Sequence, residues 1–301
     1  MQPHPNAPSP DEQLVRKWSL TPVEYLGGHA NQHWRVESGG RSMVLTRYAD
    51  RFHDIDYQLR LLARLRELRW PVPEAVDEPA RVEGRTWCLF TWLPGAARWP
   101  HPDREERRAR GRLLAELHDA TAQLGSLRQR DGYALSDELI RDPELPPLLR
   151  DYELIRPVEG RILLRYLEHA LACFDRIGPI HAETIVLHGD FSPWNLLFEG
   201  NNLTGVLDFE FAHLNYRVAD FALSWRGYQD DVIEGYEEVR RLTDLDWELL
   251  LPAYWSWLFM GVKDEIKAIT SGRKPAHDFG WQIRHLLKRS ELAGRHAAYP
   301  E

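Results

Sequence analysis

Cysteine and long apolar runs are scarce in this sequence of 301 residues. The only cysteines, Cys88 and Cys173, lie far apart in apolar surroundings, and they form no zinc-binding spacing or disulfide framework. Buried, reduced thiols are the simplest interpretation, which predicts a cytoplasmic protein. No uninterrupted apolar run reaches about 18 residues, so we expect no membrane-spanning helix and no membrane partner. The opening segment, MQPHPNAPSP, lacks the apolar core of a signal peptide, and we expect a flexible tail over residues 1–12.

Positive charge is also in deficit. The chain has 38 Lys and Arg against 46 Asp and Glu, a formal net charge of -8, and this counts against nucleic acid as the main ligand because phosphate binding favours a basic surface. Hydrophobic residues make up 43% of the chain, which is too high for a disordered protein and typical of a globular enzyme.

The first third of the chain has the pattern of a β-rich lobe. Residues 20–48 predict three strands, with the glycine pair 39–40 as a hairpin turn between the last two. Apolar residues at helical spacing predict a helix over 53–68, which two prolines end. Two more strands are predicted over 81–93, and Pro94-Gly95 then marks a boundary between lobes.

The rest of the chain is mainly helical in pattern. Residues 104–124 and 159–177 predict long amphipathic helices, and the chain from about residue 218 is again helical. The sequence therefore predicts an α+β fold with a small β-rich N-lobe and a larger, mostly helical C-lobe. The expected bounds are 13–93 for the nucleotide-binding N-lobe and 94–301 for the C-lobe, which would hold the catalytic loop, the metal site and the acceptor site.

Polar residues concentrate in the segment LHGDFSPWNLLF, residues 187–198, and shortly after it. Asn195 follows Asp190 by five positions, and Asp208 comes thirteen positions later. The apolar stretches LLF and GVL predict a hairpin that carries Asn195 and Asp208 on the two arms of one site. Their oxygen atoms suit Mg²⁺, and Asp190 would accept a proton. Since Asp, Asn, Ser and Pro are also common in ordinary turns, this interpretation depends on all three residues together.

The motifs HGDFSPWN and LDFEFA resemble the catalytic loop and metal segment of phosphoryl-transfer kinases. They are closer to the aminoglycoside-phosphotransferase and choline-kinase superfamily than to protein kinases. The segments LGGHANQHWRV, TWLPG and GRLLAELHDA support the resemblance, and GYEEVRRLTDLDWELLLP is similar to type II homoserine kinases. The resemblance covers most of the chain and implies a bilobal protein-kinase-like fold.

What the resemblance implies is an ATP-dependent phosphotransferase that acts on a hydroxyl group of a small molecule. Asp190 would orient and deprotonate the acceptor hydroxyl, and His188 would brace the catalytic loop by hydrogen bonding. Asn195 and Asp208 would hold Mg²⁺ against the nucleotide phosphates, and Glu210 stands where a glycine often follows the Asp-Phe pair. The expected nucleotide-binding residues are Gly27, Gly28, Asn31, Val44, Arg47, Phe90, Thr91 and Trp92.

Two positions depart from the kinase pattern. The basic residue expected on the third strand falls on Thr46, and Arg47 comes one place later. Because adjacent residues of a strand face opposite sides, Arg47 would point away unless a bulge re-aims it. The acidic partner expected on the following helix falls at or near Gln58. The ion pair is thus absent or replaced by uncharged groups, but retention of Asp190, Asn195 and Asp208 favours an active enzyme.

The acceptor and two alternative functions stay open from the sequence. Acidic residues that face a cleft would favour a cationic acceptor, such as an amino alcohol, an amino sugar or an aminoglycoside, whereas acidic residues on outer helix faces would carry no information. A protein serine/threonine kinase would need a long activation segment after Asp208, and none is visible. A non-catalytic nucleotide-binding pseudokinase is favoured only by Thr46 and Gln58. The acidic residues concerned are Asp220, Asp230, Asp231, Glu234, Glu237 and Glu238.

Overall fold

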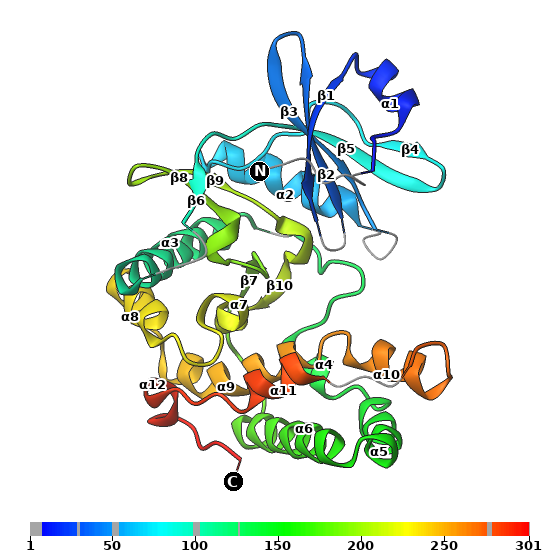
Figure 1. Cartoon of the computed structure of the whole chain (residues 1–301). Helices are drawn as coiled ribbons and strands as arrows, with labels where there is room; N and C mark the ends of the chain where they lie inside the picture. The colour runs from blue at the N-terminus through cyan, green and yellow to red at the C-terminus, as the bar shows by residue number, and fades with distance from the viewer. Residues whose placement is uncertain are drawn as a thin grey trace. The chain divides into compact units, whose positions relative to one another are not determined.

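The computed structural model describes residues 8–28, 31–49, 54–98, 103–125, 127–275 and 279–300. The chain divides into two compact units, which are Met1–Ala97 with Trp194–Glu210, and Arg98–Pro193 with Phe211–Glu301. The first unit is built around a sheet and the second is mainly helical (Figure 1), which confirms the predicted α+β class. Residues 194–210 belong to the first unit, and the bounds 13–93 and 94–301 stay a prediction.

The first unit contains an antiparallel sheet of five strands in the order β1-β2-β3-β5-β4 (Figure 1). Gly39 and Gly40 have φ of 57° and 75°, which is the double positive φ that a tight hairpin turn requires, so the predicted hairpin between β2 and β3 is confirmed. The strands are β1 (Thr21–Gly27), β2 (Gln32–Ser38), β3 (Arg41–Arg47), β4 (Ala80–Val82) and β5 (Arg85–Thr91).

One face of this sheet packs against a short helix that the sequence did not reveal, α1 (Glu12–Lys17). The Asp11 side chain caps α1 by accepting from the Gln13 amide at 2.8 Å, a favourable N-cap interaction. Leu14 of α1 packs into the core formed by Trp34 and its neighbours, and the Trp34 indole donates to the Pro8 carbonyl at 2.7 Å. Residues 8–11 are therefore held against the sheet, and residues 1–7 of the predicted tail lie outside the described residues.

The predicted helix over 53–68 is α2 (Ile55–Glu67), capped by the Asp54 side chain, which accepts from the Tyr57 amide at 3.1 Å. A second, three-stranded sheet has the order β6-β8-β9. The Val206 amide of β9 donates to the Pro71 carbonyl at 2.8 Å, so the hairpin of β8 and β9 is attached to the segment after α2. The strands are β6 (Ala96–Ala97), β8 (Leu196–Glu199) and β9 (Asn202–Val206).

The second unit is a helical assembly with a two-stranded ladder of β7 (Thr184–Leu187) and β10 (His213–Tyr216). Both predicted long helices are present, as α3 and α6. No helix among the described residues is long and apolar enough to cross a membrane. The helices are α3 (Arg104–Ala122), α4 (Ser136–Ile140), α5 (Leu145–Ile155), α6 (Pro157–Ile177), α7 (Phe221–Trp225), α8 (Asp230–Val239), α9 (Asp244–Leu258), α10 (Val262–Thr270), α11 (Gly280–Leu286) and α12 (Glu291–Gly294), with 3-10 turns at Pro193–Asn195, Phe209–Phe211 and Arg217–Asp220.

Helices α3 and α8 approach each other unusually closely, because a glycine of each faces the backbone of the other. A Cβ atom on Gly111 of α3 would lie 2.0 Å from the Val232 carbonyl oxygen, and one on Gly235 of α8 would lie 2.1 Å from the Arg108 carbonyl oxygen. Protein interiors are close-packed, so this contact excludes a side chain at either position. The pair fixes α3, which carries a histidine of the site described next.

Candidate active site

The segment HGD forms a tightly constrained loop directly after β7. The backbone amides of His188 and Gly189 both donate to the Asp220 carboxylate, at 2.8 and 2.7 Å. The Asp190 amide donates to Nδ1 of His188 at 3.1 Å. Gly189 has a φ of 83°, and a Cβ atom there would lie 2.5 Å from the Phe211 carbonyl oxygen. Only glycine tolerates both the positive φ and the close contact, so the backbone conformation directly before Asp190 is tightly restricted.

Asp220 is the residue that holds this loop, and it is fully buried. Besides the two amides, it accepts from Nε2 of His118 at 3.1 Å, and Nδ1 of His118 lies 2.9 Å from the Tyr236 hydroxyl. Burial on its own would raise the pKa of Asp220, but the hydrogen bond and charge of His118, the His188 imidazole and the His188 amide lower it below its ordinary value. Asp220 is therefore a positioning residue, ionised at neutral pH.

Sequence reasoning placed Asp220 only among acidic residues that could face a cleft, so its role was missed. The available signal was its context, because Asp220 interrupts the apolar run from Val218 to Trp225. A carboxylate in such a run is buried, and a buried carboxylate needs several donors.

We expect Asp220→Asn to lower both the stability and the turnover of the protein. The amide nitrogen of asparagine would face one of the three donors, so a buried hydrogen bond is lost at a cost of about 1–3 kcal/mol. The lowered pKa means that Asp220 stabilises the folded chain above about pH 4 and that this contribution disappears as pH falls through its folded-state pKa. Urea unfolding at pH 7 and at about pH 2 tests this: the difference between the two proteins should shrink at the lower pH, and an equal difference at both would contradict the role.

The side chains of Asp190 and His188 have different contacts within the loop. The Ser192 hydroxyl donates to the Asp190 carboxylate, which is mostly buried. His188 is buried, with its ring edge-on to Phe191 at 5.5 Å between centroids, and its Nδ1 accepts from the Asp190 amide. His188 therefore contacts the loop through its ring nitrogen, and its predicted bracing role and the catalytic role of Asp190 stay predictions.

Asn195 and Asp208 lie at the same end of the β8–β9 hairpin. Leu196 pairs with Val206, and the Leu207 amide donates to the Asn195 carbonyl at 2.8 Å. Asp208 follows directly, with its side chain exposed and a φ of 65°, a left-handed conformation that is uncommon outside glycine and is often functional. The hairpin predicted between these two residues is confirmed.

A carboxylate and a carboxamide oxygen are a donor set that suits Mg²⁺ bound together with phosphates. The described residues contain no group of three or more His, Cys, Asp and Glu side chains that would hold a metal alone. A magnesium site at this hairpin would therefore use Asn195 and Asp208 and be completed by nucleotide phosphates and water. This fits the prediction, and the metal assignment stays a proposal.

The loop after β1 is fixed by the segment that carries Asp208. Asn31 is buried, and its side-chain nitrogen donates to the Glu210 carboxylate. Its side-chain oxygen Oδ1 accepts from the Ala49 amide at 3.0 Å. A Cβ atom on Gly28 would lie 1.9 Å from the backbone carbonyl oxygen of Asn31, and Gly27 has a φ of 92°. Loop geometry thus accounts for these glycines and for Asn31, and their role in nucleotide binding stays a prediction. Residues 29 and 30 of this loop lie outside the described residues.

Arg47 does not take the place of the expected basic residue. Strand β3 pairs with β2 and β5 without a register shift, so no bulge re-aims Arg47, and its guanidinium lies 5.7 Å from the ring centroid of Trp87. Thr46 is on the opposite face, with its hydroxyl 3.0 Å from Nδ1 of His33. Arg47 therefore packs on the face that holds Trp87, and we do not include it in the proposed nucleotide site.

An uncharged pair stands near the position of the missing ion pair. Gln58 of α2 and Tyr48, which follows β3, are both buried and hydrogen-bonded to each other. Burial, followed by the nearby Cys88, Asp208 and Glu210 side chains, raises the pKa of Tyr48. Tyr48, two positions after the Thr46 at which the kinase pattern has its basic residue, is thus a protonated, neutral group near Asp208.

The segment predicted to bind adenine, Phe90–Trp92, lies at the end of β5, and its role stays a prediction. Val44 and Phe90 are directly paired across β3 and β5. The Thr91 amide donates to the Glu74 carbonyl at 2.9 Å, and the Thr91 hydroxyl accepts from the Glu74 amide at 3.0 Å, so this amide is already used within the protein. Trp92 is partly exposed, with the Arg35 guanidinium 5.0 Å from its ring centroid.

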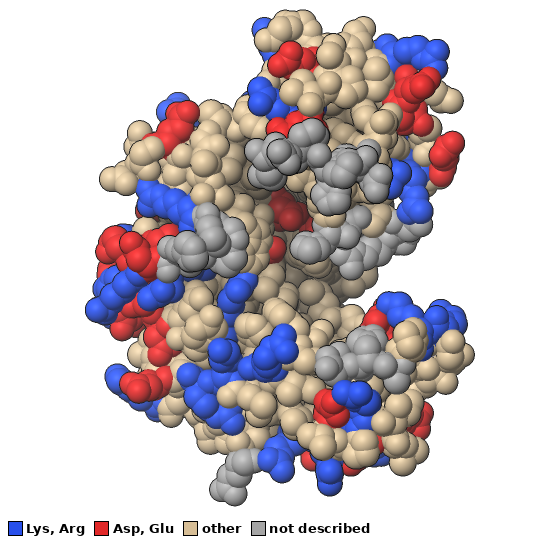
Figure 2. Space-filling model, viewed as in Figure 1, with Lys and Arg blue, Asp and Glu red and all other residues tan. Residues whose placement is uncertain are grey.

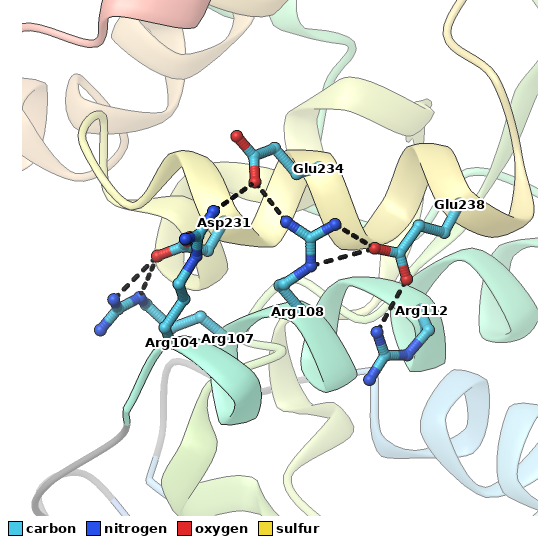
Figure 3. Close-up of polar contacts among 7 residues, drawn as sticks. All are labelled: Arg104, Arg107, Arg108, Arg112, Asp231, Glu234 and Glu238. Atoms are coloured by element: carbon cyan, nitrogen blue, oxygen red, sulfur yellow. Dashed lines mark hydrogen bonds and ion pairs between the residues drawn. The ribbon is translucent and has the colours of Figure 1, made fainter.

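The acidic residues of α8 form ion pairs with arginines of α3. Asp231 pairs with Arg104 and Arg107, and Glu234 and Glu238 both pair with Arg108, so a row of carboxylates on α8 faces a row of guanidinium groups on α3 (Figure 3). Red and blue side chains are accordingly intermixed on the surface over α3 and α8 (Figure 2). Of the other two, Asp230 accepts from the Trp225 indole and from Ser290, and Glu237 pairs with Arg241. These residues carry no information about the acceptor.

A small pocket opens beside the catalytic loop, within the second unit. It has a volume of about 40 Å³. Its wall includes Gly189, so it lies directly next to the residue before Asp190. The remaining lining residues are Gly132, Tyr133, Ala134, Ser136, Leu139, Leu187, His213, Asn215, Ala219, Ser256, Trp257 and Met260.

Comparison with known proteins agrees with these features. The homoserine kinase of Zymomonas mobilis is 27% identical over 240 residues, which cover 72% of this chain and 71% of that protein. The homoserine kinase of Brucella anthropi is 30% identical over 239 residues, covering 72% and 69%.

Two solved structures share the fold at 19% identity. A microcompartment-associated aminopropanol kinase gives a TM-score of 0.66 and covers 91% of this chain and 93% of its own. An aminoglycoside phosphotransferase in complex with ADP and hygromycin B gives 0.63 and covers 95% and 98%. The predicted superfamily, fold and enzyme class are confirmed. A model of the phosphotransferase enzyme family matches residues 21–251, and the chain belongs to this family.

Proposed function

We propose that this protein transfers a phosphoryl group from ATP, with Mg²⁺, to a hydroxyl group of a small molecule. The observation that carries this proposal is the pocket whose wall includes Gly189, because an alcohol bound there would lie beside the residue that precedes Asp190 in a loop held by Asp220. The relatives named as homoserine, aminopropanol and aminoglycoside kinases support a small alcohol as acceptor.

Asp190 would orient the acceptor hydroxyl and accept its proton as the oxygen attacks the γ-phosphate. Such proton transfer requires a carboxylate held within hydrogen-bonding distance of the hydroxyl, and the network through His188 and Asp220 holds the backbone for it. Asn195 and Asp208 would hold Mg²⁺, which supplies positive charge to the phosphate oxygens during transfer. Catalysis in this class depends mainly on positioning and electrostatics.

The direct experiment measures ADP release by the whole chain with Mg-ATP and a panel of alcohols. Turnover that requires an alcohol supports the proposal. Turnover on peptides alone would assign a protein kinase instead. Tight Mg-ATP binding without transfer to any hydroxyl would assign a non-catalytic nucleotide-binding protein, which the uncharged Tyr48–Gln58 pair would then explain.

We expect Asp208→Ala to weaken Mg²⁺-dependent ATP binding at least tenfold, because a hard divalent cation loses its carboxylate ligand. Calorimetric titration with ATP, with Mg²⁺ and with EDTA, measures the metal-dependent part. Asp244→Ala is a suitable control, since Asp244 is an aspartate at the start of α9 in the other unit. Unchanged metal dependence in Asp208→Ala would remove this residue from the metal site.

A further inference from the structure

Positive charge collects on the surface of α11, although the chain as a whole is acidic. Residues 280–300 contain four Lys and Arg against one acidic residue, and blue side chains gather in the region of α11 (Figure 2). Arg284 and Lys288 are exposed, and the Lys288 amide donates to the His285 carbonyl at 3.1 Å, so the two cations lie about one helical turn apart. No carboxylate of the described chain forms an ion pair with either of them.

The turn after α7 brings a third cation to this surface. Arg226 has a φ of 58° and Gly227 has a φ of 77°, and the left-handed conformation of a residue other than glycine is uncommon and often functional. A Cβ atom on Gly227 would lie 2.8 Å from the Tyr254 ring, so the turn is packed tightly against α9. Nε of Arg226 donates to the Leu223 carbonyl at 3.2 Å, which holds the guanidinium group at the end of α7.

His285 links α11 to this turn. Its ring is hydrogen-bonded to the Arg226 backbone, and its Nδ1 lies 3.2 Å from the Tyr254 hydroxyl. Burial is the main cause that lowers the pKa of this imidazole to about 4, and the charges of Arg226, Lys288 and Arg284 lower it further. The imidazole is therefore neutral at pH 7, with three cations close to it.

Two exposed aromatic rings border these cations. Nζ of Lys288 lies 4.2 Å from the ring centroid of Tyr228. Trp281, near the start of α11, has its ring 4.3 Å from that of His285. Tyr228 is 42% exposed and Trp281 is 39% exposed, so a ligand can reach both rings. We call this surface the cationic face, and it consists of Arg226, Tyr228, Trp281, Arg284 and Lys288.

The acidic residue nearest to this turn in sequence is already satisfied within the protein. Asp230 accepts from the Trp225 indole at 2.9 Å, from the Ser290 hydroxyl at 2.6 Å and from the Leu292 amide at 3.2 Å. Buried or half-buried carboxylates need several donors, and these three neutral groups supply them. Asp230 is therefore held by its own hydrogen bonds, and it forms no ion pair with the exposed cations of α11.

We propose that the cationic face binds a small, soluble phosphate monoester, at a site separate from the catalytic loop. None of its five residues lines the pocket beside Gly189. A phosphate monoester carries a charge of about −1.5 to −2 at neutral pH and three strong acceptor oxygens, which suit guanidinium and ammonium donors. A carboxylate offers only one charge to the same three cations.

The net charge of the chain favours a small ligand over a macromolecular one. A nucleic acid or an anionic membrane would face the field of the whole molecule, whose formal net charge is -8. A small anion responds mainly to charges within a Debye length, about 8 Å at physiological salt. The local excess of positive charge on α11 is therefore sufficient for a small phosphate compound.

Methyl phosphate is a suitable probe, because it is a phosphate monoester without an alcohol group that could be phosphorylated. It is titrated at neutral pH and low salt, with EDTA and without nucleotide, into the whole chain labelled with ¹⁵N-tryptophan. The indole resonance of Trp281 is assigned from Trp281→Phe. We expect methyl phosphate to shift this resonance with a Kd about fivefold or more below that of methyl sulfate, which has a similar shape and one negative charge. No shift, or an equal Kd for the two anions, would overturn the inference.

A matched pair of variants tests whether the cationic face itself binds the probe. Arg284→Gln and Arg150→Gln each remove one exposed arginine, and Arg150 lies on α5, outside the cationic face. We expect Arg284→Gln to raise the Kd for methyl phosphate about fivefold, the upper range for one exposed ion pair, and Arg150→Gln to leave it unchanged. Lys288→Arg keeps the charge and should retain binding. Equal weakening by both glutamine variants would show a general charge effect and overturn the site.

Vesicles of phosphatidylglycerol test whether this surface binds a membrane instead. Cosedimentation that Arg284→Gln abolishes, without a methyl phosphate shift, would assign the surface to a membrane and overturn the inference. Added NaCl should weaken methyl phosphate binding, because salt screens exposed charges, and binding that salt leaves unchanged would contradict the role of the cations. These measurements contain neither nucleotide nor Mg²⁺, so their outcome is independent of the proposed phosphotransfer.

Discussion

Asp190→Asn is expected to reduce kcat by a factor on the order of 10²–10⁴, the usual contribution of a general base, with little effect on Mg-ATP affinity. Asparagine has nearly the same shape as aspartate, and its side-chain oxygen can still accept from the Ser192 hydroxyl. The backbone contact from residue 190 to His188 does not involve the side chain. The substitution therefore removes proton acceptance and leaves the loop in place. ADP release measures kcat, and calorimetry measures Mg-ATP affinity.

A control for this variant is Asp175→Asn, which neutralises an exposed aspartate paired with Arg141 on the surface. Exposed ion pairs contribute little to stability, so kcat and the unfolding midpoint should both stay at the level of the unmodified protein. If Asp190→Asn retained more than half of the activity, proton acceptance by Asp190 would be excluded, and the residue would only position the loop. A joint loss of ATP binding and folding would indicate a structural role.

The hairpin that carries Asn195 and Asp208 was predictable because its information is local, and the β8–β9 register confirms it. The chemical roles of His188, Asp190, Asn195 and Asp208 stay a prediction. Asp220 was not predictable in the same way, because its partners come from a loop 31 and 32 residues earlier and from His118, 102 residues earlier. Only the folded chain brings these groups together.

The predicted nucleotide-binding residues also divide into features that local sequence determines and contacts that only the folded chain creates. The alternation of a strand correctly suggested that Arg47 would face away from Thr46, since β3 is regular. The hydrogen bond of Asn31 was not predictable, because its partner, Glu210, lies 179 positions away. Helix α1 was missed because it is only six residues long, and its stability depends on burial of Leu14 against the sheet. Short helices have little stability of their own.

The spacing of the acidic residues in α8 does not decide whether they face a ligand or another helix. Asp231, Glu234 and Glu238 recur at intervals of three and four along α8, which places them on one face of the helix. That face meets arginines of α3 instead of a ligand (Figure 3). Periodicity identifies the face but does not identify what covers it, and here the covering helix begins more than a hundred residues earlier.

Gly111→Ala is expected to destabilise the protein by about 3 kcal/mol or more, the upper range for overpacking a core. Its new methyl group would lie 2.0 Å from the Val232 carbonyl oxygen, and a backbone atom cannot rotate away as a side chain can. Gly235→Ala should behave similarly, because the contact there is 2.1 Å to the Arg108 carbonyl. The two helices would have to separate, at the expense of the ion pairs between them. Thermal unfolding should show a midpoint lower by several degrees.

The matched control is Gly294→Ala, also in a helix, where the new methyl would meet only the Tyr299 ring at an ordinary 3.6 Å. Alanine favours the helical conformation, so this variant should unfold within about 1 kcal/mol of the original. The helix pair also supports the site, because His118 lies on α3 and donates to Asp220. Turnover of Gly111→Ala should therefore fall at temperatures where the protein is still folded. A stable Gly111→Ala variant would show that α3 and α8 separate at little cost, and the support that this pair gives to the catalytic loop would then be dispensable.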